Sequence, residues 1–259
     1  MRRHAAEPRR NLGRALPSGR SLGWALALVC LAAALYLAAL ETPLFALRSL
    51  DVRGAPPALE AQIRHALEPL GGSSLVALDR GDLERRLGSL PGVASFAYDR
   101  DFPHALRVTV VPEQPAAVLR QGAGSWIVAA SGRVLEPVAI GTNRRLPRIW
   151  TGRTDATPAP GQTLAGDLLV AALLAGRIEA SPLAGRVRSV ESGDGEAALT
   201  LGSGLTVLLG RPTDVPLKLE IAGRIAEEVG KAPPPGSYLD LTLPARPVLG
   251  NSQPESTGR

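Results

Sequence analysis

The chain has 259 residues, long enough for two modest domains besides a membrane segment. Its formal net charge of +5 equals that of residues 1–21 alone, where six Arg stand against one Glu, so the near-neutral remainder gives no sign of a nucleic-acid-binding domain. Cys30 is the only cysteine, which excludes disulfide bonds within the chain and thiolate chemistry in the segment that follows it.

The first predicted element is an apolar segment from Leu22 to Leu40 that contains no charged residue. At about 1.5 Å per residue, a helix of this length nearly matches a hydrocarbon core roughly 30 Å thick. The Arg-rich residues 1–21 precede it, and the first charge after it is Glu41, so the positive-inside rule predicts a cytoplasmic tail and an exported remainder. A cleaved signal peptide is the alternative, but its apolar stretch is usually only about 7–15 residues long. The sequence therefore favours an uncleaved single-pass anchor of type II topology.

A compact α/β unit is predicted for residues 45–111, and it begins with a strand. Leu50 and Val52 alternate as in a half-buried strand. Apolar residues at helical spacing then predict a first helix, with Leu59, Ile63, Leu67 and Leu70 on one face.

A second helix is predicted to begin at Asp79, whose carboxylate can cap the backbone N–H groups near Asp82. Two strands follow, Val93–Arg100 and Ala105–Val111, and the short segment around Phe102-Pro103-His104 between them predicts a hairpin. The unit therefore has the order strand, helix, helix, strand, strand.

Residues 112–249 are expected to form a β-rich domain with flanking helices. One helix is predicted at Asp167–Glu179, and another begins at Asp214 with Leu217, Ile221, Ile225 and Val229 facing inward. The polar residues 250–259 are expected to be disordered. Strands are predicted at Ala116–Arg120, Trp126–Val128, Arg133–Leu135, Leu146–Trp150, Val187–Glu191, Ala197–Leu201, Leu205–Leu209 and Ser237–Leu243.

No arrangement of residues indicates an active site. The histidines, His4, His65 and His104, are too scattered to give metal-ligand spacing. The sequence contains no G-x-S-x-G elbow, no P-loop and no dinucleotide-binding glycine motif beside a strand. We therefore expect no enzymatic activity, no cofactor and no metal.

Several short motifs, in order along residues 20–249, resemble those of the FtsQ/DivIB family of bacterial cell-division proteins. No single motif is specific for the family, but the order and spacing of the motifs together are specific. The motifs are Leu50-Asp-Val-Arg-Gly54, Leu90-Pro-Gly-Val93, Arg100-Asp-Phe-Pro103, Leu106-Arg-Val-Thr-Val110, Glu113-Gln-Pro115-Ala116, Leu209-Gly210, Leu217-Lys218-Leu219 and Tyr238-Leu-Asp-Leu241.

The resemblance implies an α+β chain with one transmembrane helix, a polypeptide-transport-associated (POTRA) domain over residues 45–111 and an FtsQ-type β domain over residues 112–249. It also implies a scaffold of the division machinery, enriched at the septum, that links cytoplasmic division proteins to septal peptidoglycan synthesis. The implied partners are FtsB/FtsL-like coiled-coil proteins outside the membrane, with no nucleic acid and no small-molecule substrate.

The strand Tyr238–Leu243 is our candidate for partner binding, because the last strand of a sheet can leave an unpaired edge to which a partner adds a strand. The candidate contact residues are Tyr238, Asp240, Thr242 and Leu243. Leu239, Leu241 and Leu243 could instead pack inward. Pro244 and Pro247 cannot donate ladder hydrogen bonds, so the edge should end before them.

Two other functions are open from the sequence. POTRA-like units also serve protein assembly and secretion, usually as several tandem copies before a membrane β-barrel, whereas one copy is predicted here. An exported cell-wall enzyme is disfavoured because no catalytic constellation is present.

Overall fold

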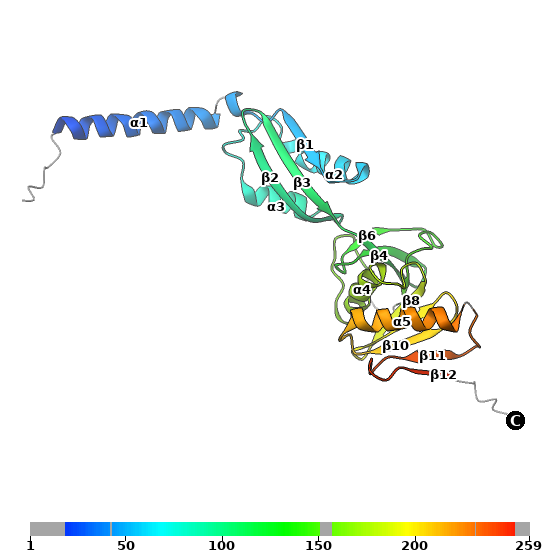
Figure 1. Cartoon of the computed structure of the whole chain (residues 1–259). Helices are drawn as coiled ribbons and strands as arrows, with labels where there is room; N and C mark the ends of the chain where they lie inside the picture. The colour runs from blue at the N-terminus through cyan, green and yellow to red at the C-terminus, as the bar shows by residue number, and fades with distance from the viewer. Residues whose placement is uncertain (1–18, 42, 151–156, 231, 252–259) are drawn as a thin grey trace, which may run out of the picture. The chain divides into compact units, whose positions relative to one another are not determined.

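The computed structural model describes residues 19–41, 43–150, 157–230 and 232–251 (Figure 1). Most of the predicted tail, residues 1–18, and the end of the segment 250–259 lie outside the described residues. By its internal contacts the chain divides into two compact units. One joins the residues up to Ser49 with Leu70–Leu78 and Arg100–Leu106, and the other comprises the rest.

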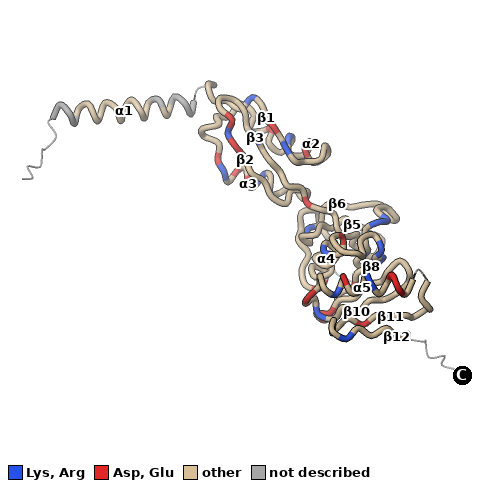
Figure 2. Tube along the Cα trace, in the orientation of Figure 1, with Lys and Arg blue, Asp and Glu red and all other residues tan. Residues whose placement is uncertain are grey.

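Helix α1 runs from Gly19 to Glu41 and covers the predicted anchor, Leu22–Leu40. The part of α1 that Figure 2 colours is uncharged, and the charged residues Arg20 and Glu41 lie at or next to the helix ends, whereas Lys, Arg, Asp and Glu are interspersed along both sheets. Within the described residues, no helix satisfies both the length and the apolarity that crossing a bilayer requires. The transmembrane role of α1 therefore stays a prediction.

The region after α1 contains a three-stranded sheet in the order β1-β3-β2. The elements along the chain follow the predicted order of strand, helix, helix, strand, strand. They are the 3-10 helix η1 (Pro43–Phe45), β1 (Ser49–Arg53), α2 (Pro57–Leu67), the 3-10 helix η2 (Glu68–Leu70), α3 (Arg80–Gly88), β2 (Val93–Asp101) and β3 (Ala105–Pro112).

The two helices of this region form for local reasons that the sequence reveals. A proline begins α2, where its missing N–H removes no helical hydrogen bond, and the helix buries Leu59, Ile63 and Leu67. The Asp79 carboxylate caps α3, accepting hydrogen bonds from the backbone N–H groups of Gly81 at 3.3 Å and Asp82 at 3.2 Å. The predicted cap is thus confirmed.

The remaining strands form one mixed sheet of nine, in the order β12-β11-β10-β9-β8-β7-β4-β5-β6. The pairs β4–β7, β7–β8 and β10–β11 are parallel. The strands are β4 (Pro115–Gln121), β5 (Gly124–Ala129), β6 (Val134–Pro137), β7 (Arg148–Trp150), β8 (Val187–Gly193), β9 (Glu196–Leu201), β10 (Thr206–Gly210), β11 (Ser237–Asp240) and β12 (Val248–Asn251).

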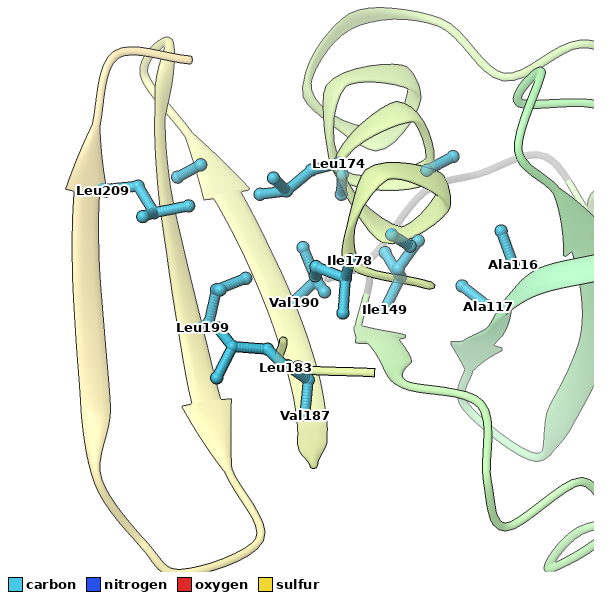
Figure 3. Packing of buried hydrophobic residues seen from close by; sticks show 14 of the residues in the cluster. Ala116, Ala117, Ile149, Leu174, Ile178, Leu183, Val187, Val190, Leu199 and Leu209 are labelled. Atoms are coloured by element: carbon cyan, nitrogen blue, oxygen red, sulfur yellow. The ribbon is translucent and has the colours of Figure 1, made fainter. Parts of the chain in front are cut away.

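Two helices supply the crossovers that parallel neighbours need. Helix α4 (Gly166–Glu179) connects β7 to β8, and α5 (Val215–Val229) connects β10 to β11. Both contribute buried residues to the single core that they share with the sheet. Figure 3 shows Leu174 and Ile178 of α4 directed toward Val190 of β8.

The predicted inward face of α5 is confirmed in part, because Ile221 and Ile225 pack against the core whereas Leu217 does not. Leu217 is 53% exposed, and the buried face also carries Val215, Leu219 and small residues. The small residues allow a close approach: a Cβ added at Gly223 would lie 2.7 Å from Pro182 Cβ.

The predicted final strand, Ser237–Leu243, is also corrected. Strand β11 ends at Asp240, and the chain turns and returns as β12, which pairs antiparallel with β11. Gly250 and Asn251 belong to β12, so the expectation of disorder fails for these two residues.

Candidate partner-binding edge

The nine-stranded sheet ends at β12, and β11 is an interior strand with β10 on one side and β12 on the other. Among the described residues, no further strand pairs with β12. The candidate edge is therefore β12, not the strand at Tyr238 that the sequence suggested. Pro247 comes directly before β12 and lacks an N–H, so strand pairing cannot extend in that direction.

Apolar side chains gather at this edge. Val248 is 53% exposed, Leu249 is 54% exposed, and Leu243, in the turn before them, is 66% exposed. Leu249 lies opposite the buried Leu239 in the pairing register, so it continues the apolar face of the core to the rim of the sheet. An added strand could cover these side chains while pairing with the β12 backbone.

The Tyr238 side chain packs against the neighbouring strand β12 of the same sheet. It lies opposite Gly250 in the β11–β12 pair, and a Cβ added at Gly250 would lie 2.5 Å from Tyr238 Cζ. The ring therefore covers the glycine, which keeps β12 close to its neighbour. Glycine in this strand marks a close approach of the tyrosine ring.

A buried lysine supports the same edge from α5. Lys218 is 1% exposed, and its ammonium group donates hydrogen bonds to the carbonyl oxygens of Leu209 at 2.6 Å and Arg211 at 2.9 Å. These carbonyls lie at the end of β10, where the chain leaves the sheet. Lys218 thus ties α5 to the strand beside β11.

Asp240 forms the turn between β11 and β12. Its Oδ1 accepts a hydrogen bond of 2.8 Å from the backbone N–H of Thr242. This bond, a second one with the Thr242 side chain and the positive charge of Lys218 lower the pKa of the Asp240 carboxyl below its usual value, although partial burial opposes them. The ionised carboxylate is thus the form that stabilises the turn.

The four predicted contact residues therefore divide into two groups. Tyr238 and Asp240 are half-buried and bonded or packed within the edge, and Thr242 lies in the turn. Leu243 is exposed beside β12, while Leu239 and Leu241 pack inward. The sequence analysis did not identify Val248 and Leu249 as candidate contact residues. The signal that could have identified them is the pair of apolar residues directly before Gly250.

The described residues around β12 include no feature that suggests catalysis. The described residues contain no group of His, Cys, Asp or Glu that could hold a metal ion. A cavity of about 320 Å³ lies beside the end of α5, where Gly185, Gly202 and Gly230 contribute to its lining. Among the described residues that line it, the charged side chain is Arg186, which pairs with Glu227 at 3.7 Å. The absence of enzymatic activity remains an expectation.

Comparisons with known proteins match parts of this chain. The family model "POTRA domain, FtsQ-type" matches residues 45–111. The cell division protein FtsQ of Rhizobium meliloti (strain 1021) is 28% identical over 115 residues, which cover 44% of this chain and 37% of that protein. The match thus spans little more than a third of the relative's length.

A solved structure is also similar in part. It is the major extracytoplasmic domain of the bacterial cell division protein DivIB from Geobacillus stearothermophilus, with 10% identity and a TM-score of 0.30 over 41% of this chain and 82% of that one. A score of this size does not indicate a common fold.

Residues 45–111 thus match an FtsQ-type POTRA domain, which a mixed sheet with an open edge follows. The resemblance to the FtsQ/DivIB family of bacterial cell-division proteins, predicted from the motifs, is confirmed by the family model and the R. meliloti relative.

Proposed function

We propose that this protein is a non-enzymatic scaffold of the bacterial division machinery, required for septum formation. It would link cytoplasmic division proteins to the machinery that synthesises septal peptidoglycan. The observation that carries the proposal is the FtsQ-type POTRA domain at residues 45–111.

The scaffold would be held in the cell membrane by α1, with the N-terminus in the cytoplasm and both sheets outside. Two observations support this. Helix α1 is 23 residues long, and its charged residues, Arg20 and Glu41, lie at or next to its ends. The apolar side chains described along it are exposed, including Trp24 at 74% and Leu37 at 58%, as they must be to face lipid.

The topology is testable with a reporter enzyme that works on only one side of the membrane, fused after Leu249. We expect activity outside the cytoplasm, because the Arg-rich segment precedes α1. Activity confined to the cytoplasm would reverse the orientation and remove the sheets from the septal compartment.

Partner binding would use the β12 edge. A coiled-coil division protein of the FtsB/FtsL kind would add an extended segment beside β12 and bury the apolar side chains there. Strand β12 has only four residues, so backbone pairing alone gives a short contact. Leu243, Val248 and Leu249 would then supply much of the affinity.

A substitution at the edge tests this binding mode. Leu249→Lys places a charge where the partner would bury an apolar side chain, so co-purification of the FtsB/FtsL-like partners should be lost. The matched control is Ile140→Lys, since Ile140 is 61% exposed and follows β6, the other end strand of the sheet. Equal loss with both variants, or with neither, would contradict binding at β12.

Depletion of the protein from its source cell tests the wider role. The scaffold account predicts filamentous cells with unfinished septa. Normal septation with a defect in envelope export would support the assembly or secretion alternative instead.

A further inference from the structure

Two exposed apolar side chains lie close to the point where the chain leaves α1. Leu44, in η1, is 66% exposed, and Phe102, in the turn between β2 and β3, is 51% exposed. Phe45 connects them, because it follows Leu44 and its ring meets the Phe102 ring edge-on at a centroid distance of 5.7 Å. These three residues form what we call the apolar tip.

The apolar tip is held in place by the backbone around it. The N–H of Leu75 donates to the carbonyl of Phe45 at 2.8 Å, and the N–H of Arg48 donates to the carbonyl of His104 at 2.9 Å. His104 Nδ1 also lies 3.2 Å from the carbonyl oxygen of Ala46. The segment after α1 and the Phe102 turn are therefore joined, so Phe102 cannot move far from η1.

The length of the connecting chain limits where the tip can be. Helix α1 ends at Glu41, and Leu44 is three residues further on, so the two Cα atoms are at most about 11 Å apart. Glu41 is charged and would lie in the headgroup region if α1 spans the bilayer. That region is only about 5–8 Å deep on each side of the hydrocarbon core.

We propose that the apolar tip inserts into the outer headgroup region of the same membrane that α1 spans, so that the POTRA domain itself contacts lipid. The proposal rests on the proposed anchoring role of α1. Leucine and phenylalanine gain free energy at the boundary between headgroups and acyl chains.

The charges beside the tip define which lipids it should accept. Arg48 is exposed and can meet a lipid phosphate, but Asp101 is also exposed and precedes Phe102. Because these charges oppose each other, insertion should depend on the apolar side chains and should occur with both anionic and zwitterionic lipids. The tip is therefore expected to bind the bilayer interface itself, without selecting a particular lipid headgroup.

Fluorescence quenching in vesicles separates this proposal from the anchor on which it rests. The full chain is reconstituted into phosphatidylcholine vesicles, with or without phosphatidylglycerol, containing lipids that carry a nitroxide either on the headgroup or deep in the acyl chain. A fluorophore on the native Cys30, which is exposed in the middle of α1, reports the anchor. A fluorophore on Phe102→Cys, in a Cys30→Ser background, reports the tip.

The control is Ile140→Cys in the same background, because Ile140 is exposed and apolar but not joined to the end of α1. Circular dichroism first establishes that the labelled proteins are folded. We expect the acyl-chain nitroxide to quench the fluorophore at 30, the headgroup nitroxide to quench most of the fluorescence at 102, and neither to affect 140.

Each other outcome contradicts a definite part of the account. Quenching at 30 with none at 102 would overturn the inference and leave the anchor intact. No quenching at 30 would overturn the anchor and the inference with it. Equal quenching at 102 and 140 would mean non-specific adsorption and would also overturn the inference.

Discussion

Lys218 is a charged side chain that the fold keeps out of water, and no carboxylate of the described residues forms a salt bridge with it. Burial of an ammonium group is costly unless its donors are satisfied, and here the carbonyl oxygens of Leu209 and Arg211 accept from it. The carbonyl oxygens at the end of a strand need a hydrogen-bond donor. A long side chain from α5 can supply this donor, so no local turn is needed to supply it. Lys218 is thus a structural cation that connects α5 to β10.

Lys218→Met tests this role because it retains most of the side-chain volume while it removes the donor. The two carbonyls would be left without that donor, so we expect the free energy of unfolding to fall by about 1–3 kcal/mol, measured by urea denaturation. Arg224→Met on the exposed side of α5 is the control, and a change below about 0.5 kcal/mol is expected there. A Lys218→Met variant as stable as the wild type would contradict the role.

Asp240 gives the edge a predictable pH dependence. Because its carboxyl pKa is lower in the folded state, the unfolded state binds the proton more tightly, and ionisation stabilises the fold. This contribution is present above the ordinary Asp pKa of about 3.9 and is lost as pH falls through the lower folded value. Asp240→Asn should therefore be less stable than the wild type at neutral pH. The difference should shrink in acid, as urea titrations at several pH values would show; a difference independent of pH would contradict this account.

At the scale of elements, the region from β1 to β3 could be predicted from the sequence because its signals are local. The 3.6-residue spacing of Leu59, Ile63 and Leu67, the Asp79 cap and the alternation along β3 each act within a few residues. The face of α5 could be predicted only in part, since Ile221 and Ile225 pack against the core but Leu217 is exposed. Its packing depends on Ala222 and Gly223, which contribute little to an apolar pattern but allow the helix to approach its neighbours closely.

Strand β12 was missed for a different reason. It is short, contains a glycine and follows two prolines, and it forms only because β11 is available across a turn. Its existence is a tertiary effect, and so is the location of the open edge. The sequence indicated the correct end of the chain for the candidate site but placed it one strand too early.

Gly223→Ala tests the close packing of α5. Alanine favours a helix over glycine by about 1 kcal/mol, but its Cβ would meet Pro182 at 2.7 Å. We expect the clash to prevail and to lower the free energy of unfolding by about 1–2 kcal/mol. The same change at Gly88, in α3, has no atom within 4 Å of the new Cβ and should be neutral or stabilising. Equal effects at the two sites would argue against tight packing at Gly223.

At the scale of the whole molecule, the chain combines a basic N-terminal segment, a helix whose charged residues lie only at or next to its ends, and two sheets whose charges are interspersed (Figure 2). Charges of mixed sign along the sheets largely cancel at long range, so in our proposal the contacts with other proteins come from shape, apolar patches and open strands. The β12 edge is such a feature, and the apolar tip is a second one that faces lipid in our proposal.

Complementation in depleted cells tests the central claim most directly, namely that the protein supports division through the β12 edge. The native protein is depleted while wild type, Leu249→Lys or Ile140→Lys is supplied at equal level, and cell length and septum completion are measured by microscopy. We predict that wild type and Ile140→Lys restore septa, whereas cells with Leu249→Lys remain filamentous although the variant is folded and membrane-bound. Full division with Leu249→Lys would contradict the account.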